Sequence, residues 1–593
     1  MNVSNGALTS TYNKIAIDMA LIIDVGLIAL FWCTSSLIVN PIGNFPLNDD
    51  WAYGLTVKHL LDTGDYHPVG WTSAALITNV LWGYLFCLPA GFSYTALRLS
   101  TLFASLFGLI GTYILVRDLQ GPRWVALVVT LSLGFNPIYY ALSHTFMTDV
   151  CFTAIAIWAA VFFARSLKSG SDLQMFIGTL FAVAATLSRQ IALCVPLAFA
   201  LSVLARSPLT ARAMLRAAFP LILCVTAFVT FNHWLEMSDR LPIRHDAQNQ
   251  KLYELFTKLE YLITRPLATT STALVYLGLF LLPTLVLSAK NILGTHRGRA
   301  TVLIAAGILV LVGGPLVLAH YGHAALTPVV VPDNIFLDGN VILMPIAGNV
   351  LDPSGIGPLT LRDTYVLHLN HMPALPIVFW IAVTVSGLIG AMLLIAKLSV
   401  FASDLIPRLL RRRLIGDSEA VGVFLLLCGS IYLLPLLGGG FFDRYLVPTT
   451  PFFAAGIVGI TGKFGDFPVT GGTKILRTAA FALLAAFSVY AIGSTRDYLA
   501  WNRVRWEALQ DLMHDGHIDA EEIDGGFEFN GLHFYDPNYQ LHFNSDKSWW
   551  WVHGDMYEIG FGPVPGYTVI KEYTYLHWLP MHEQKIVVLR KKL

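Results

Sequence analysis

The sequence has few charged residues. Asp, Glu, Lys and Arg make up 13% of its 593 residues, whereas hydrophobic residues make up 55%. Because soluble domains average about 25% charged residues, this composition excludes an ordinary soluble protein and indicates a chain that crosses a membrane many times. The formal net charge is zero, so nothing in the composition suggests a nucleic-acid partner.

The sequence also lacks two common ligand-binding patterns. It contains no glycine-rich phosphate loop of the P-loop type and no CxxC or Cys/His spacing typical of a zinc site. All six cysteines fall in hydrophobic stretches, which predicts small buried side chains: Cys33, Cys87, Cys151, Cys194, Cys224 and Cys428. The first apolar run has about 20 residues and no small-residue cleavage site, so we expect it to be retained as a span.

Long hydrophobic runs are abundant, and they predict an all-α polytopic membrane protein of about 13 spans. The expected spans are residues 18–39, 94–116, 124–142, 150–166, 173–188, 190–205, 217–236, 268–289, 300–319, 375–397, 421–437, 446–462 and 476–494. Residues 1–496 would form the transmembrane domain, and residues 497–593 a small α+β domain outside the membrane.

The positions of Lys and Arg predict the sidedness of the chain. They cluster in alternate connections, and the remaining connections are poorer in cations apart from a basic patch between residues 240 and 265. The positive-inside rule therefore places the N-terminus in the cytoplasm and the C-terminal segment outside an inner (plasma) membrane. Residues 70–90 are one more apolar run, but counting them as a span would turn the basic clusters outward. Their Trp, Tyr, Ser, Thr and Asn residues suit a helix in the membrane interface, within a first external loop of residues 40–93.

The most informative motif is the run from Asn48 to Tyr53, Asn-Asp-Asp-Trp-Ala-Tyr, which follows the first span. Its adjacent carboxylates, Asp49 and Asp50, lie at the membrane surface, where desolvation makes charge costly. A chain tolerates this arrangement more readily where it needs a proton acceptor or a cation ligand. The alternative is a solvated loop in which Asn and Asp cap a helix.

Three more charged residues stand at the predicted external edge. Asp149 lies where a short loop enters a span, and it is either a helix cap or a second carboxylate facing the same cavity as Asp49. Arg189 interrupts an apolar stretch, and it either snorkels to the interface or binds a phosphate with its planar fork of donors. Arg444 follows three glycines, and it either pairs with Asp443 or grips a phosphate in the same way.

No cofactor follows from these patterns. Several histidines fall in the predicted external connections, but their spacing is irregular. This leaves a divalent metal as an open alternative without a defined ligand set.

The C-terminal segment is rich in aromatic and turn residues. Residues 567–571 and 585–589 are short runs of β-branched and apolar residues, and they predict strands. The aromatic residues fit either an ordinary small cap or a surface that holds a sugar ring or an acceptor. Nothing in this segment looks catalytic by itself.

The order and spacing of these motifs resemble those of the GT-C membrane glycosyltransferases. The matching runs are Asp49-Asp50-Trp51-Ala52-Tyr53, Gly64-Asp65-Tyr66, His67-Pro68-Val69, Ala96-Leu97-Arg98-Leu99, Asp149 and Arg444-Tyr445-Leu446-Val447-Pro448. The branch that looks closest is the bacterial relatives of protein O-mannosyltransferases, which include lipid A aminoarabinose and galacturonic acid transferases. The resemblance is good over residues 18–205, thinner to residue 460 and weak beyond. Asp50 stands where the family has Glu, and Val69 where it has Pro.

The resemblance implies an enzyme that transfers a sugar from a polyprenyl-phosphate donor to a lipid, glycan or protein acceptor at the extracytoplasmic face, with inversion. Asp49 would take the proton of the acceptor hydroxyl, with Asp50 beside it, and Asp149 would orient the acceptor or a cation. The donor phosphate would be bound by Arg189, Arg444 and His67. The competing class is a transporter or flippase, in which charged residues line a path through the membrane. Here the charges gather at one face, and no inverted repeat is visible.

Overall fold

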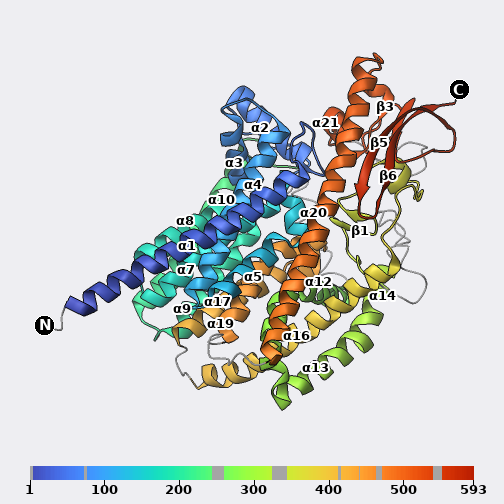
Figure 1. The fold of residues 1–593 in the computed structure, drawn as a ribbon. Helices are drawn as coiled ribbons and strands as arrows, with labels where there is room; N and C mark the ends of the chain where they lie inside the picture. Colours follow the sequence, from blue (N-terminus) through green and yellow to red (C-terminus); the bar gives the residue numbers. More distant parts are fainter. Residues whose placement is uncertain are drawn as a thin grey trace.

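The protein is a bundle of helices with a small sheet near its C-terminus (Figure 1). The computed structural model describes residues 4–72, 76–243, 259–322, 343–411, 416–439, 441–461, 471–538 and 550–592. This arrangement is the predicted fold class, a polytopic helical protein with an α+β C-terminal part.

Eight helical segments of the described residues are long and apolar enough to cross a membrane. They lie in α1 (Ser4–Val39), α4 (Tyr94–Asp118), α7 (Thr148–Ser169), α10 (Ala211–Met237), α12 (Leu259–Leu293), α13 (His296–Ile308) with α14 (Gly314–Gly322), α16 (Ile377–Leu410) and α20 (Gly471–His514). A π-helical turn, η2 (Leu309–Gly313), joins α13 to α14. The consecutive helices α5 (Arg123–Gly134) and α6 (Pro137–Ser143) are bent by 64° and would make a ninth span.

The other predicted spans are shorter helices. They are α8 (Asp172–Thr186), α9 (Cys194–Arg206) with the turn η1 (Gln190–Leu193), α17 (Asp417–Leu433) with α18 (Leu436–Gly439), and α19 (Thr450–Thr461) with the 3₁₀ helix η4 (Asp443–Thr449). All thirteen predicted spans therefore fall on helices. The α-helices α8, α9, α17 and α19 have 12 to 17 residues each, which is shorter than the roughly 20 residues that a single straight span needs.

The apolar run at residues 70–90 forms a short helix, α3 (Ile77–Cys87), rather than a span. An α-helix of this length rises only about 17 Å, against a hydrocarbon core of about 30 Å. α3 packs against α2 (Asp50–Thr63) and α4, and the indole N–H of Trp82 donates to the carbonyl of Ser100 at 2.9 Å. This region therefore forms part of the connection between α1 and α4, as predicted.

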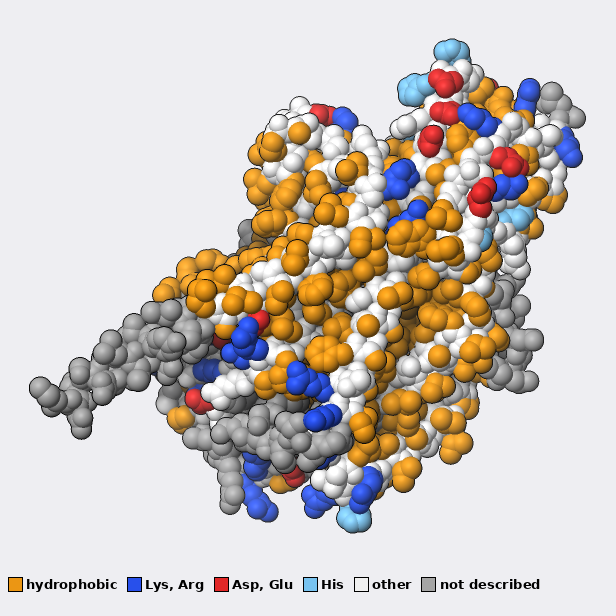
Figure 2. All heavy atoms as spheres, viewed as in Figure 1, with side chains coloured by type: hydrophobic (Ala, Val, Ile, Leu, Met, Phe, Trp, Pro, Cys, Tyr) orange, Lys and Arg blue, Asp and Glu red, His pale blue; other side chains and the backbone are white. Residues whose placement is uncertain are grey.

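The surface of the bundle fits a membrane environment. Hydrophobic side chains cover the flank of the helices in Figure 2, whereas Lys and Arg gather at the lower end of this view and both acidic and basic residues at the upper end. Apolar residues of α1, α10 and α13, such as Ile22, Leu215 and Leu303, are largely exposed. Exposed apolar surface of this extent is favourable only where lipid replaces water.

The C-terminal part is built on α20, which projects from the bundle towards the sheet (Figure 1). The sheet has the order β3 (Ile523–Asp524), β4 (Tyr557–Gly560), β6 (Met581–Lys591), β5 (Tyr567–Trp578), with β3 parallel to β4 and the other pairs antiparallel. β5 and β6 contain the two predicted strands, which confirms both. The predicted domain boundary at residues 496–497 falls inside the continuous helix α20.

Four smaller pieces complete this end of the molecule. The long connection between α14 and α16 contains a two-stranded hairpin, β1 (Leu351–Asp352) and β2 (Gly355–Ile356), and the single helical turn α15 (Arg362–Tyr365). Between β3 and β4 lies the helix α21 (Phe527–Phe534), and the short 3₁₀ turn η5 (Ala520–Glu522) precedes β3. α21 contacts α2, so the C-terminal part lies against the first connection.

Membrane sidedness can be tested with single cysteines. Five native cysteines are buried and Cys33 is exposed, so a Cys33→Ala protein provides the background. Leu410 and Met581 are both highly exposed. We expect an impermeant thiol reagent to label Met581→Cys in intact cells, and Leu410→Cys only after permeabilisation. The opposite pattern would contradict the predicted topology.

Candidate active site

Arg98, near the start of α4, fixes the chain that leads to Asp49. The side chain of Arg98 is buried. Its guanidinium donates to the carbonyl oxygens of Pro41 (2.6 Å), Gly43 (3.2 Å) and Phe45 (2.9 Å). A buried charge needs such acceptors because an unpaired one is costly in an apolar interior. The connection after α1 is thereby tied to α4, and this arginine of the Ala-x-Arg-Leu motif has a structural role.

Asp50 joins the first two connections of the predicted external face. Its carboxylate is buried and accepts the backbone N–H groups of Leu47 and, at 3.1 Å, Phe146. Burial raises the pKa of Asp50 to about 7. Because backbone amides occupy both carboxylate oxygens, Asp50 is a structural joint in this arrangement, whereas the sequence predicted a catalytic carboxylate.

Asp49 is the more accessible of the two carboxylates. It precedes the first residue of α2, but its side chain makes no cap hydrogen bond within the described chain. Its Oδ1 accepts the indole N–H of Trp71 at 2.8 Å, and its Oδ2 lies 3.3 Å from Nη2 of Arg444. The side chain is 17% exposed. The carboxylate is therefore held from two sides and still reachable.

A second pair lies close by, at the start of α7. Asp149 is buried, and its Oδ1 accepts from Nη1 of Arg189 at 2.5 Å. No described residue donates a hydrogen bond to the other oxygen, Oδ2. Arg189 is therefore paired with an acid of a different helix rather than simply snorkelling to the interface. The free oxygen of Asp149 is an acceptor for a ligand hydroxyl or a cation.

The aromatic ring of Tyr445 connects the two pairs. The guanidinium carbon of Arg189 lies 5.7 Å from the ring centre, and that of Arg444 lies 5.6 Å from it. Burial, followed by the charge of Asp49, raises the pKa of Tyr53. Both arginines and Asp149 also act on this phenol electrostatically. Two acids and two arginines thus surround the two tyrosines.

Arg444 is aimed at this site by the residue before it. Asp443 is buried and accepts the backbone N–H groups of Val350 (3.1 Å), Leu351 (2.8 Å) and Arg444 (2.7 Å). The predicted alternative, an ion pair of Asp443 with the Arg444 side chain, is therefore not what the structure contains. The guanidinium reaches Asp49, and its Nε has no hydrogen-bond acceptor among the described residues.

His67 lies apart from these four charged residues. It lines a surface hollow of about 340 Å³ along α2, together with Leu55, Lys58, His59, Asp62 and Val69. The ring centres of His67 and His59 are 5.9 Å apart. The structure therefore brings together Asp49, Asp149, Arg189 and Arg444, but not His67.

Three side chains at the site were not among the predicted site residues: Tyr53, Trp71 and Tyr445. Tyr53 and Tyr445 belong to the same sequence motifs as Asp49 and Arg444. Their membership of these motifs could have identified them as site residues. Trp71 gave no such signal, because it belongs to an apolar run interpreted as interfacial. Within the described ranges, no group of three or more His, Cys, Asp or Glu side chains is arranged to hold a metal ion.

A comparison with known protein families finds one match. Residues 77–235 match the family model described as dolichyl-phosphate-mannose-protein mannosyltransferase. The match indicates a GT-C glycosyltransferase embedded in the membrane, the class of protein that the motifs predicted. More particularly, the segment with α4, α7, Asp149 and Arg189 carries the sequence pattern of the protein mannosyltransferase family. No curated protein matches the chain.

Two solved structures are similar at a low level. One is ArnT from Cupriavidus metallidurans in the apo state, with 12% identity, a TM-score of 0.34, and coverage of 87% of this chain and 84% of that one. The other is the same protein bound to undecaprenyl phosphate, with 13% identity, a TM-score of 0.31, and 78% of both chains covered.

Replacing Asp50 by Asn tests its structural role. The Asn side chain has one acceptor oxygen, so it can accept only one of the two backbone N–H groups that Asp50 accepts. A buried backbone N–H without an acceptor costs about 1–3 kcal/mol, so we expect a lower unfolding temperature. The pKa of about 7, against an ordinary value near 4, means that the folded protein keeps a proton that the unfolded chain releases. This contribution to stability is lost as the pH rises through 7.

The difference in unfolding temperature between the wild type and Asp50→Asn should therefore be larger at pH 5 than at pH 8. Thermal unfolding of the purified protein in detergent measures it. A difference that grows with pH would contradict a buried, protonated carboxyl at this position.

Proposed function

We propose that this enzyme transfers a sugar from a polyprenyl-phosphate donor to an acceptor hydroxyl at the extracytoplasmic face of the membrane, with inversion at the anomeric carbon. The observation that carries this proposal is the pair of acid–arginine contacts, Asp49–Arg444 and Asp149–Arg189, whose guanidinium carbons lie 5.6 and 5.7 Å from the centre of the Tyr445 ring. The family model that matches residues 77–235 is named for an enzyme with such a donor, dolichyl-phosphate mannose.

Buried ion pairs are a poor way to stabilise a fold. The desolvation of two charges often exceeds their attraction, and an apolar pair of the same size is frequently as stable. Arg444 is 10% exposed and Asp149 only 1%. Asp49 and Arg189 are less buried, at 17% and 19% exposed. We infer that the chain keeps these four charges together for a reason beyond stability, and charge stabilisation during a reaction is such a reason.

Asp49 is our candidate for the general base. Its carboxylate would take the proton of the acceptor hydroxyl while the acceptor oxygen bonds to the anomeric carbon and the bond from that carbon to the phosphate oxygen breaks. The lipid phosphate leaves with the electron pair. Attack opposite to the leaving phosphate inverts the anomeric carbon. The 17% exposure of Asp49 gives an acceptor access to it.

Arg444 is our candidate for binding the donor phosphate. Its contact with Asp49 is loose at 3.3 Å, its Nη1 reaches only the sulfur of Met147 at 3.9 Å, and its Nε is unpaired within the described chain. Several N–H groups are thus available for phosphate oxygens, which a planar guanidinium binds in pairs. Arg189 supplies a second positive charge at the same ring, held by Asp149. His67 has no part in this proposal because it lies in the separate hollow.

Reconstitution tests the proposed activity directly. Proteoliposomes containing the full-length protein would be given polyprenyl-phosphate sugars with a radiolabelled sugar, and sugar transfer or release would be followed together with the appearance of free lipid phosphate. We expect turnover with at least one donor and a product of inverted configuration. Absence of turnover with a panel of such donors, or a product of retained configuration, would contradict the proposal.

Replacing Asp49 by Asn tests the proposed base. Removal of a general base typically costs about 10²- to 10⁴-fold in rate, so we expect transfer to fall by at least that factor while donor binding persists. Asp62→Asn is a matched control, because Asp62 lies on the same helix and is exposed beside Lys58. Near-normal turnover of Asp49→Asn would remove it from the mechanism.

Replacing Arg444 by Ala tests the proposed phosphate contact. We expect the apparent KM for the lipid donor to rise about tenfold or more, because charge-assisted hydrogen bonds to the phosphate are lost. Arg444→Lys should recover only part of this, since an ammonium cannot form the paired contacts. Arg240→Ala is the control, because Arg240 pairs with Asp65 instead. An unchanged donor KM in Arg444→Ala would exclude this residue from donor binding.

A further inference from the structure

An aromatic cluster from two distant parts of the chain surrounds the contact between Trp71 and Asp49. We define this aromatic cluster as Trp51, Trp71, Phe527, Tyr535, Trp550 and Trp551. The rings of Trp71 and Trp551 meet edge to face with centres 4.9 Å apart, and those of Trp71 and Phe527 are 5.7 Å apart. Trp51 and Trp551 are almost fully buried. The C-terminal part thus supplies the surface against which the Trp71 indole rests.

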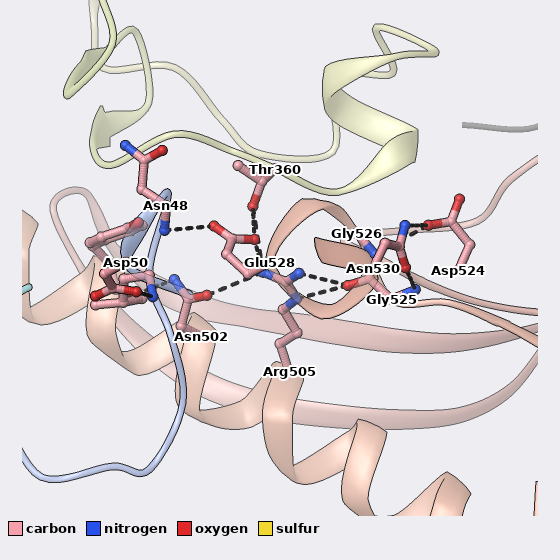
Figure 3. Close-up of polar contacts among 12 residues, drawn as sticks. Asn48, Asp50, Thr360, Asn502, Arg505, Asp524, Gly525, Gly526, Glu528 and Asn530 are labelled. Carbon is pink, nitrogen blue, oxygen red and sulfur yellow. Dashed lines mark hydrogen bonds and ion pairs between the residues drawn. The ribbon is translucent and has the colours of Figure 1, made fainter. Parts of the chain in front are cut away.

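A second contact from the C-terminal part reaches the residue before Asp49. Glu528 of α21 accepts the backbone N–H of Asn48 at 3.0 Å through its Oε1 (Figure 3). Its Oε2 accepts from the hydroxyl of Thr360 at 2.6 Å and from Nη1 of Arg505 at 2.8 Å. Glu528 and Arg505 are fully buried. One carboxylate therefore ties the first connection, the long connection before α16 and helix α20 together.

We propose that the C-terminal part positions Asp49 for catalysis, with Trp71 and Glu528 as positioning residues. This inference rests on the proposed function, in which Asp49 is the base. Trp71 holds Oδ1 of Asp49 and leaves Oδ2 to face Arg444 and the acceptor. Glu528 holds the backbone one residue earlier. The C-terminal part acts on the carboxylate through both.

The need for such positioning follows from the donor step. When the donor phosphate engages Arg444, the 3.3 Å contact that steadies Oδ2 of Asp49 is weakened. The indole N–H of Trp71 then keeps the carboxylate in place at its other oxygen. A displacement of about 1 Å at a reacting group costs up to 10²-fold in rate. The loss of Trp71 should therefore lower kcat and leave the donor KM unchanged.

Trp71→Phe removes the indole N–H and keeps an aromatic ring in the cluster. In the full-length protein we expect kcat to fall about tenfold, the cost of one hydrogen bond to a charged group, with the donor KM within twofold of the wild type. Trp380→Phe is the matched control. The Trp380 indole is also buried and donates to a carbonyl, that of Pro353 at 3.2 Å, so this variant should lose stability while keeping kcat.

A double-mutant cycle tests the contact without requiring turnover. The unfolding temperatures of Trp71→Phe, Asp49→Ala and the double variant would be measured in detergent. We expect Trp71→Phe to have a smaller effect in the Asp49→Ala background than in the wild type, because the acceptor is already gone. Additive effects would show that the two side chains do not interact and would overturn the inference.

The part played by the C-terminal segment is tested by Trp551→Ala, which removes the ring that supports Trp71 but leaves the Trp71 indole intact. We expect a fall of several-fold in kcat without a change in the donor KM. A wild-type kcat in either Trp551→Ala or Trp71→Phe would overturn the positioning role. A different result is non-additive effects of Trp71→Phe and Asp49→Ala on the unfolding temperature together with a wild-type protein that transfers no sugar. This result would contradict the proposed function but would still support the contact between Trp71 and Asp49.

Discussion

The spacing of the two acids of the site depends on a buried carboxylate that joins the two connections on which they lie. Asp50 accepts one N–H from Leu47 and one from Phe146, so it fastens the first connection to the second. Asp49 directly precedes Asp50, and Asp149 follows Phe146 by three positions. Any movement at this joint would therefore alter the spacing of Asp49 and Asp149, and with it the spacing of the arginines that they hold.

The charges of the site balance each other. Two aspartates and two arginines carry no net charge, which makes their burial tolerable although it contributes little to stability. A phosphodiester donor adds one negative charge, and the departing lipid phosphate, now a monoester, gains a second one because it takes the electron pair of the broken bond. The arginines can follow that charge because each is held by an acid on one side and by an aromatic ring on the other.

Much of the fold was predictable because hydrophobic length and cation placement are direct consequences of the bilayer. The isolated charges Asp149, Arg189 and Arg444 were recognisable for the same reason, since each stands in or beside apolar sequence. The difference between Asp49 and Asp50 was not predictable. Successive residues at a helix start point about 100° apart, and only the packed neighbours decide which carboxylate is enclosed by amides.

The contacts that link the C-terminal part to the site were also beyond the reach of the sequence. Asn48 and Glu528 are 480 residues apart, and Trp71 lies in an apolar run whose composition indicates only an interfacial helix. A hydrogen bond between such positions depends on how distant segments of the chain pack in the tertiary structure. It leaves no periodicity or spacing from which it could be read.

The unbroken course of α20 has a consequence of a different kind. With 44 residues and a rise of about 1.5 Å per residue, it is about 66 Å long, roughly twice the thickness of a hydrocarbon core. The number of residues in such a helix sets both the rotation of the C-terminal part about the helix axis and its distance from the bundle. Adding one residue between the bundle and Arg505 would turn everything beyond it by about 100° and carry the guanidinium away from Glu528. Adding seven would nearly restore the angle but raise the sheet by about 10 Å. The rotation of the residues at the end of α20 is thus constrained by the number of residues in the helix. Natural changes in the length of α20 are therefore expected in whole turns.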